Sequence, residues 1–365
     1  MRRWHFFLLT ALAGVVAASI PTAAEPPVPP NAWTALHATG DGPKFGGLPG
    51  GRGWMQVGFD QVTGEVVLFG GSSETYMSDI VTYVFAENRW HLRRPDPEPA
   101  GPCRRDNQTF VYDPIADKFW MWNGAIDAAA QPGCRHGPNA GLWTYDRKAN
   151  AWTLVGEAYE RMLAPGAAFD PESRFILQFG GEHGLTSNTK DWTVLLDTRT
   201  GRFERLSTVS ASPPPSVNIQ GGLLYVPPLK KFLLFGGRQS SGAKIAYDQT
   251  WLFDPRRRRW ERLYPSISPP ARDLHSMVFD QANGVVILHG GRAADRESTL
   301  ADTWVFDPLK GIWTDITPAL ADPGPPMRHG NGVYDPINKI MLMIPGEWGR
   351  DTYGFRYRPH LLERK

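Results

Sequence analysis

The sequence predicts an all-β fold, a β-propeller in which six blades of four antiparallel strands surround a channel. Three observations predict it. Glycine and proline are frequent, 38 and 33 of 365 residues, and their spread along the chain indicates many turns between short strands. A motif recurs six times at near-constant spacing. The N-terminal segment resembles an outer strand that the sixth copy of the motif lacks.

Each copy of the motif begins with an aromatic residue, usually followed by Asp, and reaches a glycine-containing pair eleven residues later. Successive copies start 53 to 57 residues apart, which is the sign of a repeat architecture. The aromatic residues are Phe59, Tyr112, Phe169, Tyr225, Phe279 and Tyr334. The pairs are Gly70-Gly71, Asn123-Gly124, Gly180-Gly181, Gly236-Gly237, Gly290-Gly291 and Pro345-Gly346.

The fifth copy shows most clearly how one unit makes four strands. Residues 285–288 form a continuous apolar run, as expected of a strand buried on both faces. The following glycine pair ends this strand, because glycine permits positive φ and close backbone approach. The segments around Trp304 and Trp313 form a hairpin across Asp307-Pro308. A single four-stranded sheet cannot bury both faces alone, so the sheets are expected to stack around an axis.

These residues carry a family resemblance. The glycine pair, the strand Asp302-Thr303-Trp304-Val305-Phe306-Asp307 and the following Trp313 resemble kelch repeats over about residues 31–358. The resemblance implies a propeller of the galactose oxidase-like superfamily. The second and sixth copies depart from the pattern, with Asn123 and Pro345 at the first glycine position.

The N-terminal segment is expected to close the ring. Residues 31–36 read like the outer strand at 150–154, whereas the sixth unit has no such strand after Tyr357. The segment is therefore expected to pair onto residues 351–357 and to remove the open sheet edge. The alternative is an unpaired N-terminal strand beside an open ring.

The predicted organisation has four parts. Residues 1–24 form a signal peptide, 25–30 a Pro-rich linker, 31–358 the propeller and 359–365 a tail. The closing strand covers 31–38, and the blades cover about 52–97, 104–156, 161–209, 214–265, 270–318 and 325–358.

The N-terminus predicts export to the periplasm or the cell exterior. Arg2 and Arg3 precede an apolar run at 6–20 and small residues at 22–24, the pattern of a secretory signal. An uncleaved membrane anchor is the alternative. Cleavage would leave no membrane span and 37 basic against 37 acidic residues, so charge favours neither nucleic acid nor membrane-surface partners. We expect a monomer.

The two cysteines, Cys103 and Cys134, are expected to form a disulfide in an oxidising compartment. In a kelch propeller, the loop before the first strand and the loop after the second strand lie at the same end of the channel. Cys103 falls in the first kind of loop and Cys134 in the second, within one blade.

Arginines recur in the loops that a kelch propeller places at that end. The predicted ligand-binding residues are Arg52, Arg105, Arg161, Asn218, Arg238, Arg272, Arg292, Arg328 and Arg350. Arginine suits bidentate recognition of carboxylate, sulfate or phosphate, so an acidic glycan or an acidic protein segment is the expected partner. In some kelch proteins similar arginines bind an acidic partner. The alternative is that these arginines hydrogen-bond loop carbonyls and pair with Asp residues between blades.

Two function classes follow. The first is an exported interaction module that binds a glycan or a protein through the arginine-lined mouth. The second is an enzyme on acidic sugars, a uronate lyase or a sialate-type epimerase, with His275, His329, His183 and Glu182 as candidate catalytic residues. A structural surface protein without a small ligand is a third reading. No cofactor is expected, and no metal site, because no two histidines stand at metal-ligand spacing and the two cysteines are expected to bond to each other. The copper-radical chemistry of galactose oxidase is not expected either, because the chain has no free Cys for the Cys–Tyr link and too few blades.

Overall fold

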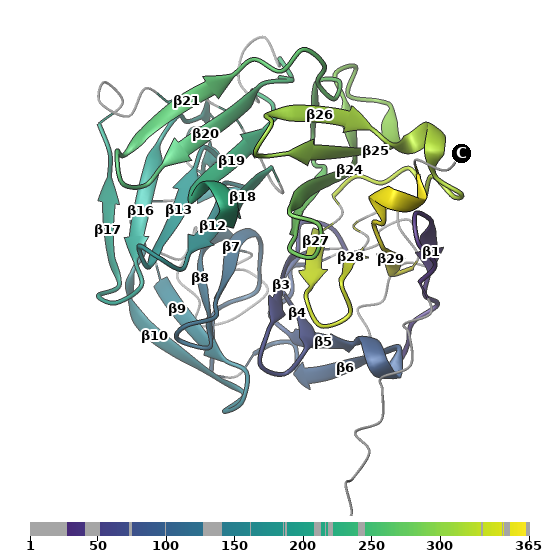
Figure 1. The fold of residues 1–365 in the computed structure, drawn as a ribbon. Helices are drawn as coiled ribbons and strands as arrows, with labels where there is room; N and C mark the ends of the chain where they lie inside the picture. The colour runs from purple at the N-terminus through teal and green to yellow at the C-terminus, as the bar shows by residue number, and fades with distance from the viewer. Residues whose placement is uncertain are drawn as a thin grey trace, which may run out of the picture.

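The computed structural model describes residues 28–40, 52–72, 75–98, 100–126, 141–160, 162–184, 186, 188–207, 213–215, 217, 222–239, 245–329, 331–344, 346 and 351–362. Within these residues the fold is all-β, with antiparallel sheets arranged around a common centre (Figure 1). We number the six large sheets 1 to 6 in chain order.

The first three large sheets follow one another along the chain. Sheet 1 contains β3 (Gln56–Asp60), β4 (Glu65–Phe69), β5 (Ile80–Val84) and β6 (Arg89–Arg94), and β2 (Thr39–Gly40) joins β6 in parallel. Sheet 2 contains β7 (Arg105–Asp113), β8 (Lys118–Ile126), β9 (Gly141–Asp146) and β10 (Ala151–Glu157). Sheet 3 contains β12 (Gly166–Asp170), β13 (Phe175–Phe179), β16 (Thr193–Asp197) and β17 (Arg202–Arg205).

The remaining large sheets repeat this order. Sheet 4 contains β18 (Leu223–Val226), β19 (Lys231–Phe235), β20 (Thr250–Asp254) and β21 (Arg259–Leu263). Sheet 5 contains β22 (Arg272–Asp273), β23 (Ser276–Asp280), β24 (Val285–Ala293), β25 (Thr299–Asp307) and β26 (Ile312–Asp315). Sheet 6 contains β27 (Asn331–Asp335), β28 (Ile340–Ile344), β29 (Tyr353–Phe355) and β1 (Trp33–Ala35).

Smaller elements complete the described chain. β11 (Met162–Leu163), β14 (Glu182–His183) and β15 (Asn188–Thr189) form a short three-stranded sheet. Four 3₁₀ turns are η1 (Phe85–Glu87), η2 (Pro227–Leu229), η3 (Thr317–Ala319) and η4 (Pro359–Leu361).

The first strands of the large sheets contact one another in cyclic order. β3 contacts β7, β7 contacts β12, and the series continues through β18, β23 and β27, which contacts β3. The apolar clusters lie between neighbouring sheets. For example, Leu177 of sheet 3 packs with Phe232 of sheet 4, and Leu224 of sheet 4 with Leu288 of sheet 5. Stacking of sheet on sheet therefore supplies the core.

The glycine pair follows the second strand in sheets 1, 3 and 4, at what we call the Gly-pair end. The expectation that the pair ends the strand is wrong for sheet 5, because β24 continues through Gly290-Gly291 with a shift in register after His289. Gly70 and Gly71 have φ of 63° and 99°, values that favour glycine. A Cβ at Gly70 would lie 2.8 Å from the carbonyl oxygen of Arg105 in the next sheet, and the Gly71 N–H donates to that oxygen at 2.8 Å. Gly236-Gly237 and Gly290-Gly291 repeat this contact with Arg272 and Met327. Glycine is needed here for both reasons that the sequence suggested.

The Asp after each repeat aromatic shapes the turn between the first two strands, at what we call the Asp-turn end. Asp60 Oδ1 accepts the N–H groups of Val62 and Thr63, and four further Asp residues likewise accept the N–H group two residues later. They are Asp113, Asp170, Asp280 and Asp335. Sheet 4 has Val226 instead and turns through η2, whose two prolines fix φ.

A tryptophan on the outer strand ties three pairs of sheets together. Trp260 Nε1 donates to Thr193 Oγ1 at 2.9 Å, from sheet 4 to sheet 3. Trp313 Nε1 donates to Thr250 at 3.0 Å, from sheet 5 to sheet 4. Trp33 of β1 donates to Thr303 of sheet 5 at 3.0 Å, so β1 occupies the place of an outer strand in sheet 6.

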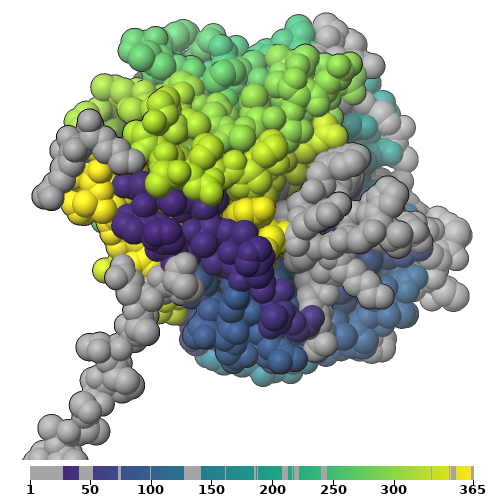
Figure 2. All heavy atoms as spheres, turned by 90° about the vertical axis from the view of Figure 1, so that its right-hand side faces the viewer, coloured from purple at the N-terminus to yellow at the C-terminus, as the bar shows by residue number. Residues whose placement is uncertain are grey.

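The N-terminal segment bridges the last and first sheets. β1 pairs antiparallel with β29, with Trp33 opposite Phe355, which is the pairing that the sequence predicts. β2 then pairs with β6 of sheet 1. In Figure 2 this purple segment lies between the yellow C-terminal strands and the blue strands of sheet 1. Asn31 fixes its start, because its side chain exchanges two hydrogen bonds of 2.8 Å with the backbone of Arg358.

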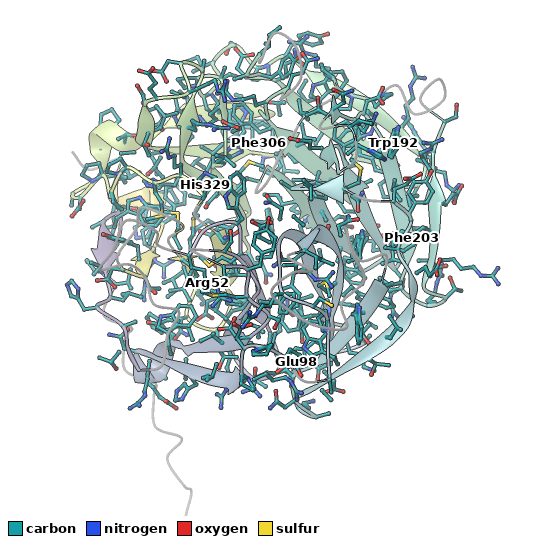
Figure 3. All side chains as sticks on the ribbon, turned by 180° about the vertical axis from the view of Figure 1, so that it is seen from behind. Arg52, Glu98, Trp192, Phe203, Phe306 and His329 are labelled. Carbon is teal, nitrogen blue, oxygen red and sulfur yellow. The ribbon has the colours of Figure 1, made fainter. Side chains whose placement is uncertain are left out.

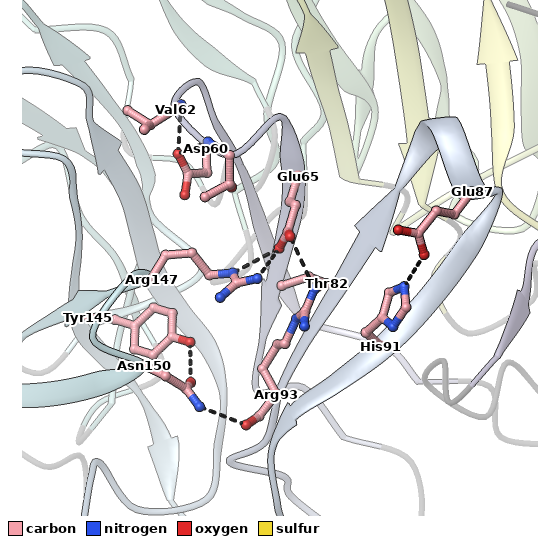
Figure 4. Close-up of polar contacts among 11 residues, drawn as sticks. Asp60, Val62, Glu65, Thr82, Glu87, His91, Arg93, Tyr145, Arg147 and Asn150 are labelled. Carbon is pink, nitrogen blue, oxygen red and sulfur yellow. Dashed lines mark hydrogen bonds and ion pairs between the residues drawn. The ribbon is translucent and has the colours of Figure 1, made fainter.

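Sheets 1 and 2 are also joined by charged groups at the outer edge of the Asp-turn end (Figure 4). Glu65 at the start of β4 accepts from Arg93 of β6 at 3.0 Å. Its second oxygen accepts from Arg147, in the turn after β9 of sheet 2, at 2.8 and 2.6 Å. Because Glu65 is buried, this paired carboxylate links the two sheets with little water between them.

Candidate functional site

Three of the predicted ligand arginines that the structure describes, Arg52, Arg238 and Arg272, are buried in ion pairs at the Gly-pair end. Arg272 donates to the Gly290 carbonyl at 2.9 Å and holds both oxygens of Asp302 at 2.6 Å. Arg52 repeats this with the Gly70 carbonyl and Asp79. Burial works against the charge of Asp302, but hydrogen bonding to Arg272 and its positive charge outweigh it and lower the pKa of this carboxyl. Arg52 and Arg272 therefore have the structural role that the sequence left open as the alternative, in which the arginines bind carbonyl groups and pair with Asp residues.

Arg105 occupies the same position in sheet 2, and no carboxylate of the described residues pairs with it. Its guanidinium donates to the carbonyls of Cys103 at 3.0 Å and Asn123 at 3.1 Å. One terminal nitrogen has no partner, and the residue is fully buried. Gly141 stands where sheet 5 has Asp302, which explains the missing partner. Burial lowers the pKa of Arg105 to about 9.

In sheet 4 the predicted site position is shifted by one residue. The sequence placed it seven residues before the repeat aromatic, at Asn218. The Gly181 N–H donates to the carbonyl of Val217 at 2.8 Å, as Gly71 does to Arg105. Val217, which is buried, therefore takes the position that the sequence assigned to Asn218. Asn218, Arg161, Arg350 and Cys134 lie outside the described residues. Their roles, including the disulfide to Cys103, stay predictions.

Arg238 and Arg292 converge on one carboxylate. Arg292 donates to both oxygens of the buried Asp273, at 3.0 and 2.5 Å. Arg238 reaches across from sheet 4, with its Nε 3.3 Å from Asp273 Oδ1 and a terminal nitrogen on the Ala293 carbonyl at 2.7 Å. The Arg292 side chain retains 21% exposure, so part of this cation faces solvent. Two guanidinium groups on one carboxylate leave excess positive charge.

Of the predicted ligand arginines that the structure describes, Arg292 on sheet 5 and Arg328 before sheet 6 keep solvent access, whereas Arg238 is buried. Arg328 of sheet 6 is half-buried and adjoins His329, whose ring lies edge-on to Trp54 at 3.9 Å between centroids. Figure 3, from behind, shows Arg52 and His329 near one another. After the glycine pair of sheet 3, Glu182 stands at the position that Arg238 and Arg292 hold in sheets 4 and 5. The predicted arginines therefore do not form a uniform ring among the described residues.

Backbone bonds join neighbouring sheets at this end through residues with left-handed φ. Trp54, Asn107, Ala164, Leu274 and His329 have φ between 47° and 57°. The N–H of Asn107 donates to Trp54, that of Ala164 to Asn107, and that of His329 to Leu274, at 2.9 to 3.2 Å. Non-glycine residues adopt this conformation at a cost, so the surrounding contacts must hold it. The site therefore has a rigid floor, a feature that the repeat spacing does not reveal.

Two candidate catalytic histidines are buried. Burial, together with nearby arginine charge, lowers the pKa of His275 and of His329 to about 3. Both ring nitrogens of His275 and Nδ1 of His329 have no hydrogen-bond partner. A general base works best with a pKa near the operating pH and with access to substrate, so neither histidine has the properties expected of one.

The other two candidate catalytic residues, His183 and Glu182, lie on β14 of the short three-stranded sheet. His183 on β14 is 3.7 Å from Glu160 and lies edge-on to Trp192, while Glu182 pairs with Leu163 in the small sheet. Among the described residues, no group of three or more His, Cys, Asp or Glu side chains is placed to hold a metal ion. A search of the same residues finds no helix with the length and hydrophobicity of a membrane span.

Comparison with known proteins places this geometry in a family. The KLHDC2/KLHL20/DRC7 Kelch-repeats domain matches residues 142–346, more than half of the chain. The serine/threonine-protein phosphatase BSL2 of Arabidopsis thaliana is 25% identical over 264 residues, covering 67% of this chain and 23% of the phosphatase. The chain thus spans about a quarter of the length of that curated relative. With the glycine pairs and the repeated four-stranded sheets, these matches show that the chain belongs to the kelch-repeat family.

Proposed function

We infer that this protein is an exported, closed six-bladed kelch propeller that binds an acidic segment of a partner protein at its Gly-pair end. Kelch repeats generally mediate protein–protein interaction, which favours a protein partner over a glycan. Export rests on the signal-like pattern of residues 1–24, which lie outside the described residues. Periplasmic or extracellular action follows from that pattern.

The closed six-bladed form is supported by two independent contacts. The first strands contact one another in a cycle that returns from β27 to β3. Trp33 makes the same hydrogen bond to Thr303 that Trp313 makes to Thr250, so β1 acts as the outer strand of a sixth blade. A closed ring fixes the loops of all blades around one channel mouth, which suits recognition by several loops together.

The observation that carries the binding proposal is the pair Arg238 and Arg292 on Asp273. Asp295, in the exposed turn beside them, is satisfied by its own turn, since it accepts the N–H groups of Glu297 and Ser298 and the Ser298 hydroxyl. Arg292 stands on β24 with its side chain 21% exposed, while Arg238, in an isolated bridge to Ala246, is buried beside it. Such a site offers charge-assisted hydrogen bonds to a carboxylate without first having to order its own side chains.

The test uses a fluorescein-labelled peptide with five consecutive glutamates, measured by fluorescence anisotropy. We expect saturable binding that weakens as salt rises, because exposed charges are screened. Arg292→Ala and Arg328→Ala should each weaken binding about 10-fold, equivalent to about 1.4 kcal/mol. The matched control is Arg257→Ala, whose side chain is 83% exposed in the turn between β20 and β21.

Three outcomes would overturn the proposal. The peptide does not bind at low salt, or Arg257→Ala weakens binding as much as Arg292→Ala does. Alternatively, oligogalacturonate binds in an Arg292-dependent way and the peptide does not, which would establish a glycan site. Release of unsaturated uronate, followed by ultraviolet absorbance, would establish the lyase alternative.

A further inference from the structure

The opposite end of the channel holds a cavity. It has a volume of about 350 Å³, lies at the Asp-turn end, and is lined by the first strands of all six large sheets. Its walls include the six aromatic residues with which the repeats begin: Phe59, Tyr112, Phe169, Tyr225, Phe279 and Tyr334. The repeat spacing therefore gathers one aromatic side chain from every sheet around the axis.

The tyrosine hydroxyls of this cavity are already used within the protein. Tyr112 donates to Asp117 at 2.8 Å and lies 3.2 Å from Asp60 of the preceding sheet. The Tyr334 hydroxyl accepts the Ala282 N–H at 3.2 Å, and burial raises its pKa. Burial likewise raises the pKa of Tyr225. The tyrosines therefore present ring faces and edges to the cavity rather than free hydroxyl groups.

The rest of the lining is uncharged. It consists of aliphatic residues and prolines, together with Gln61 and Gln281, whose exposed side-chain amides lie at the mouth of the cavity. A polysaccharide needs many hydrogen bonds to its hydroxyl groups, and two amides supply few. An apolar side chain needs none, whereas a peptide backbone beside it can use the two amides.

Exposed aliphatic residues extend this surface over three adjacent sheets. Ile337, Val62 and Ile115 occupy the same position of the Asp turn in sheets 6, 1 and 2, and are 62%, 53% and 51% exposed. In sheets 3 and 4 the turns instead carry Glu172 and Lys230, paired at 2.8 Å. The apolar rim is thus confined to one side of the cavity, and contiguous exposed apolar surface marks an interaction site.

We propose that this end of the channel is a second docking site, which takes an aromatic or long aliphatic side chain from an uncharged segment of a partner protein. The volume is near the lower limit of small-ligand pockets, which fits one large side chain. The flanking residues of the segment lie across Ile337, Val62 and Ile115. The site is on the face opposite Arg292 and does not depend on the acidic-segment proposal.

The test uses N-trifluoroacetylated peptides Gly-Ser-X-Ser-Gly-amide, with X as Trp, Leu, Lys or Glu, followed by ¹⁹F NMR line broadening. We expect the Trp and Leu peptides to bind with Kd values below about 1 mM, and at least about 10-fold more tightly than the Lys and Glu peptides. The Gln61→Glu/Gln281→Glu double variant, nearly isosteric, should weaken the Trp peptide about fivefold or more. It places two charges at an apolar site without removing any packing.

Two controls separate this site from the rest of the surface. Gln239→Glu at the Gly-pair end should leave Trp-peptide binding unchanged, as should Arg292→Ala. Replacing Val62, Ile115 and Ile337 by Ser should weaken binding about twofold or more, while Ser at the exposed Leu309 and Ile267 should not. The proposal fails if the Trp peptide shows no saturable binding at about 5 mM, if the Lys peptide binds equally, or if the glutamine variant binds as the native chain does.

Discussion

The seam between sheets 4 and 5 and the seam between sheets 1 and 2 stand at equivalent places but are held differently. At the first, Trp313 donates to Thr250 and the Gly237 N–H donates to the Arg272 carbonyl. The Arg272 guanidinium is in turn neutralised by Asp302. The tryptophan, the arginine and the glycine N–H of this seam thus each have a partner, although the buried His275 beside Phe235 has none at either ring nitrogen.

The seam between sheets 1 and 2 keeps the backbone bond and loses both side-chain partners. Gly71 still donates to the Arg105 carbonyl. Ile80 stands at the threonine position, so Trp152 packs on it with its Nε1 unpaired. Gly141 stands at the aspartate position, so Arg105 has no carboxylate among the described residues. The ion pairs of this seam lie instead at its outer edge, around Glu65.

The comparison separates what the repeat requires from what it tolerates. Backbone bonds through the glycine pairs recur at both seams, because they depend only on φ and on the missing Cβ. The side-chain pairs, such as Trp313 with Thr250 and Arg272 with Asp302, are present at one seam and replaced at the other, so the fold does not require them at every seam. We therefore expect the same substitution to have different effects at the two seams.

The largest difference is expected for methionine at the buried arginine. Met162 and Met327 occupy this position in sheets 3 and 6, so the side chain fits the fold. Arg272→Met leaves Asp302 without its cationic partner and with only the Trp304 indole N–H, and should lower the free energy of unfolding by about 3 kcal/mol. Arg105→Met removes a buried charge that has no carboxylate and should cost less than about 1 kcal/mol. Equilibrium unfolding in urea measures both.

Equal losses in the two methionine variants would contradict this interpretation. They would mean that Arg105 is stabilised as fully as Arg272 and that the missing carboxylate is supplied elsewhere. Asp302→Ala provides a second check, because it should destabilise the protein to a similar extent as Arg272→Met by leaving a buried cation unpaired.

Acid should affect the seam between sheets 4 and 5 more than the seam between sheets 1 and 2. His275 lies at this seam, with a pKa of about 3 against 6.5 when unfolded. The unfolded chain therefore binds the proton first, and stability falls as pH drops below 6.5. For this residue the loss between pH 7 and pH 5 is about 2 kcal/mol. His275→Leu should remove that part of the pH dependence, as measured by urea unfolding at both pH values.

The effect should be specific to the buried ring. His360→Leu, in the exposed turn η4, serves as the control for removing a histidine elsewhere. Hydrogen exchange at pH 5 should show faster exchange in β23 and β24 than in β7 and β8. An unchanged pH dependence in His275→Leu would show that the buried imidazole is not the source.

Much of the fold could be predicted from the sequence because its determinants are local. The glycine pairs need positive φ, and Trp33 lies in a segment that resembles an outer strand, so the pairing of this segment with residues 351–357 could be predicted, although the register could not. The match to the kelch family confirms the resemblance on which this interpretation rested.

The site could be predicted only in part. The repeat spacing placed Arg52, Arg105 and Arg272 at the Gly-pair end. It could not predict that their side chains are buried, because burial depends on how the sheets pack against one another. The prediction named Asn218 where the structure has Val217, because counting back seven residues from Tyr225 assumes a loop of constant length. The aromatic cavity was missed although its six residues define the repeat, since an aromatic strand residue is ordinarily part of the core.

The smallest difference concerns a single hydrogen bond. Trp→Phe at positions 33, 260 and 313 removes an indole N–H that donates to a buried threonine, so each should cost about 1 kcal/mol beyond the loss of ring area. Trp152→Phe removes no such bond and should cost only the ring area. Urea midpoints of the four variants, with Thr250→Val in a double-mutant cycle with Trp313→Phe, isolate the bond. A coupling energy near zero would mean that the tryptophans join the sheets by packing alone, and the two seams would then differ only in their charges.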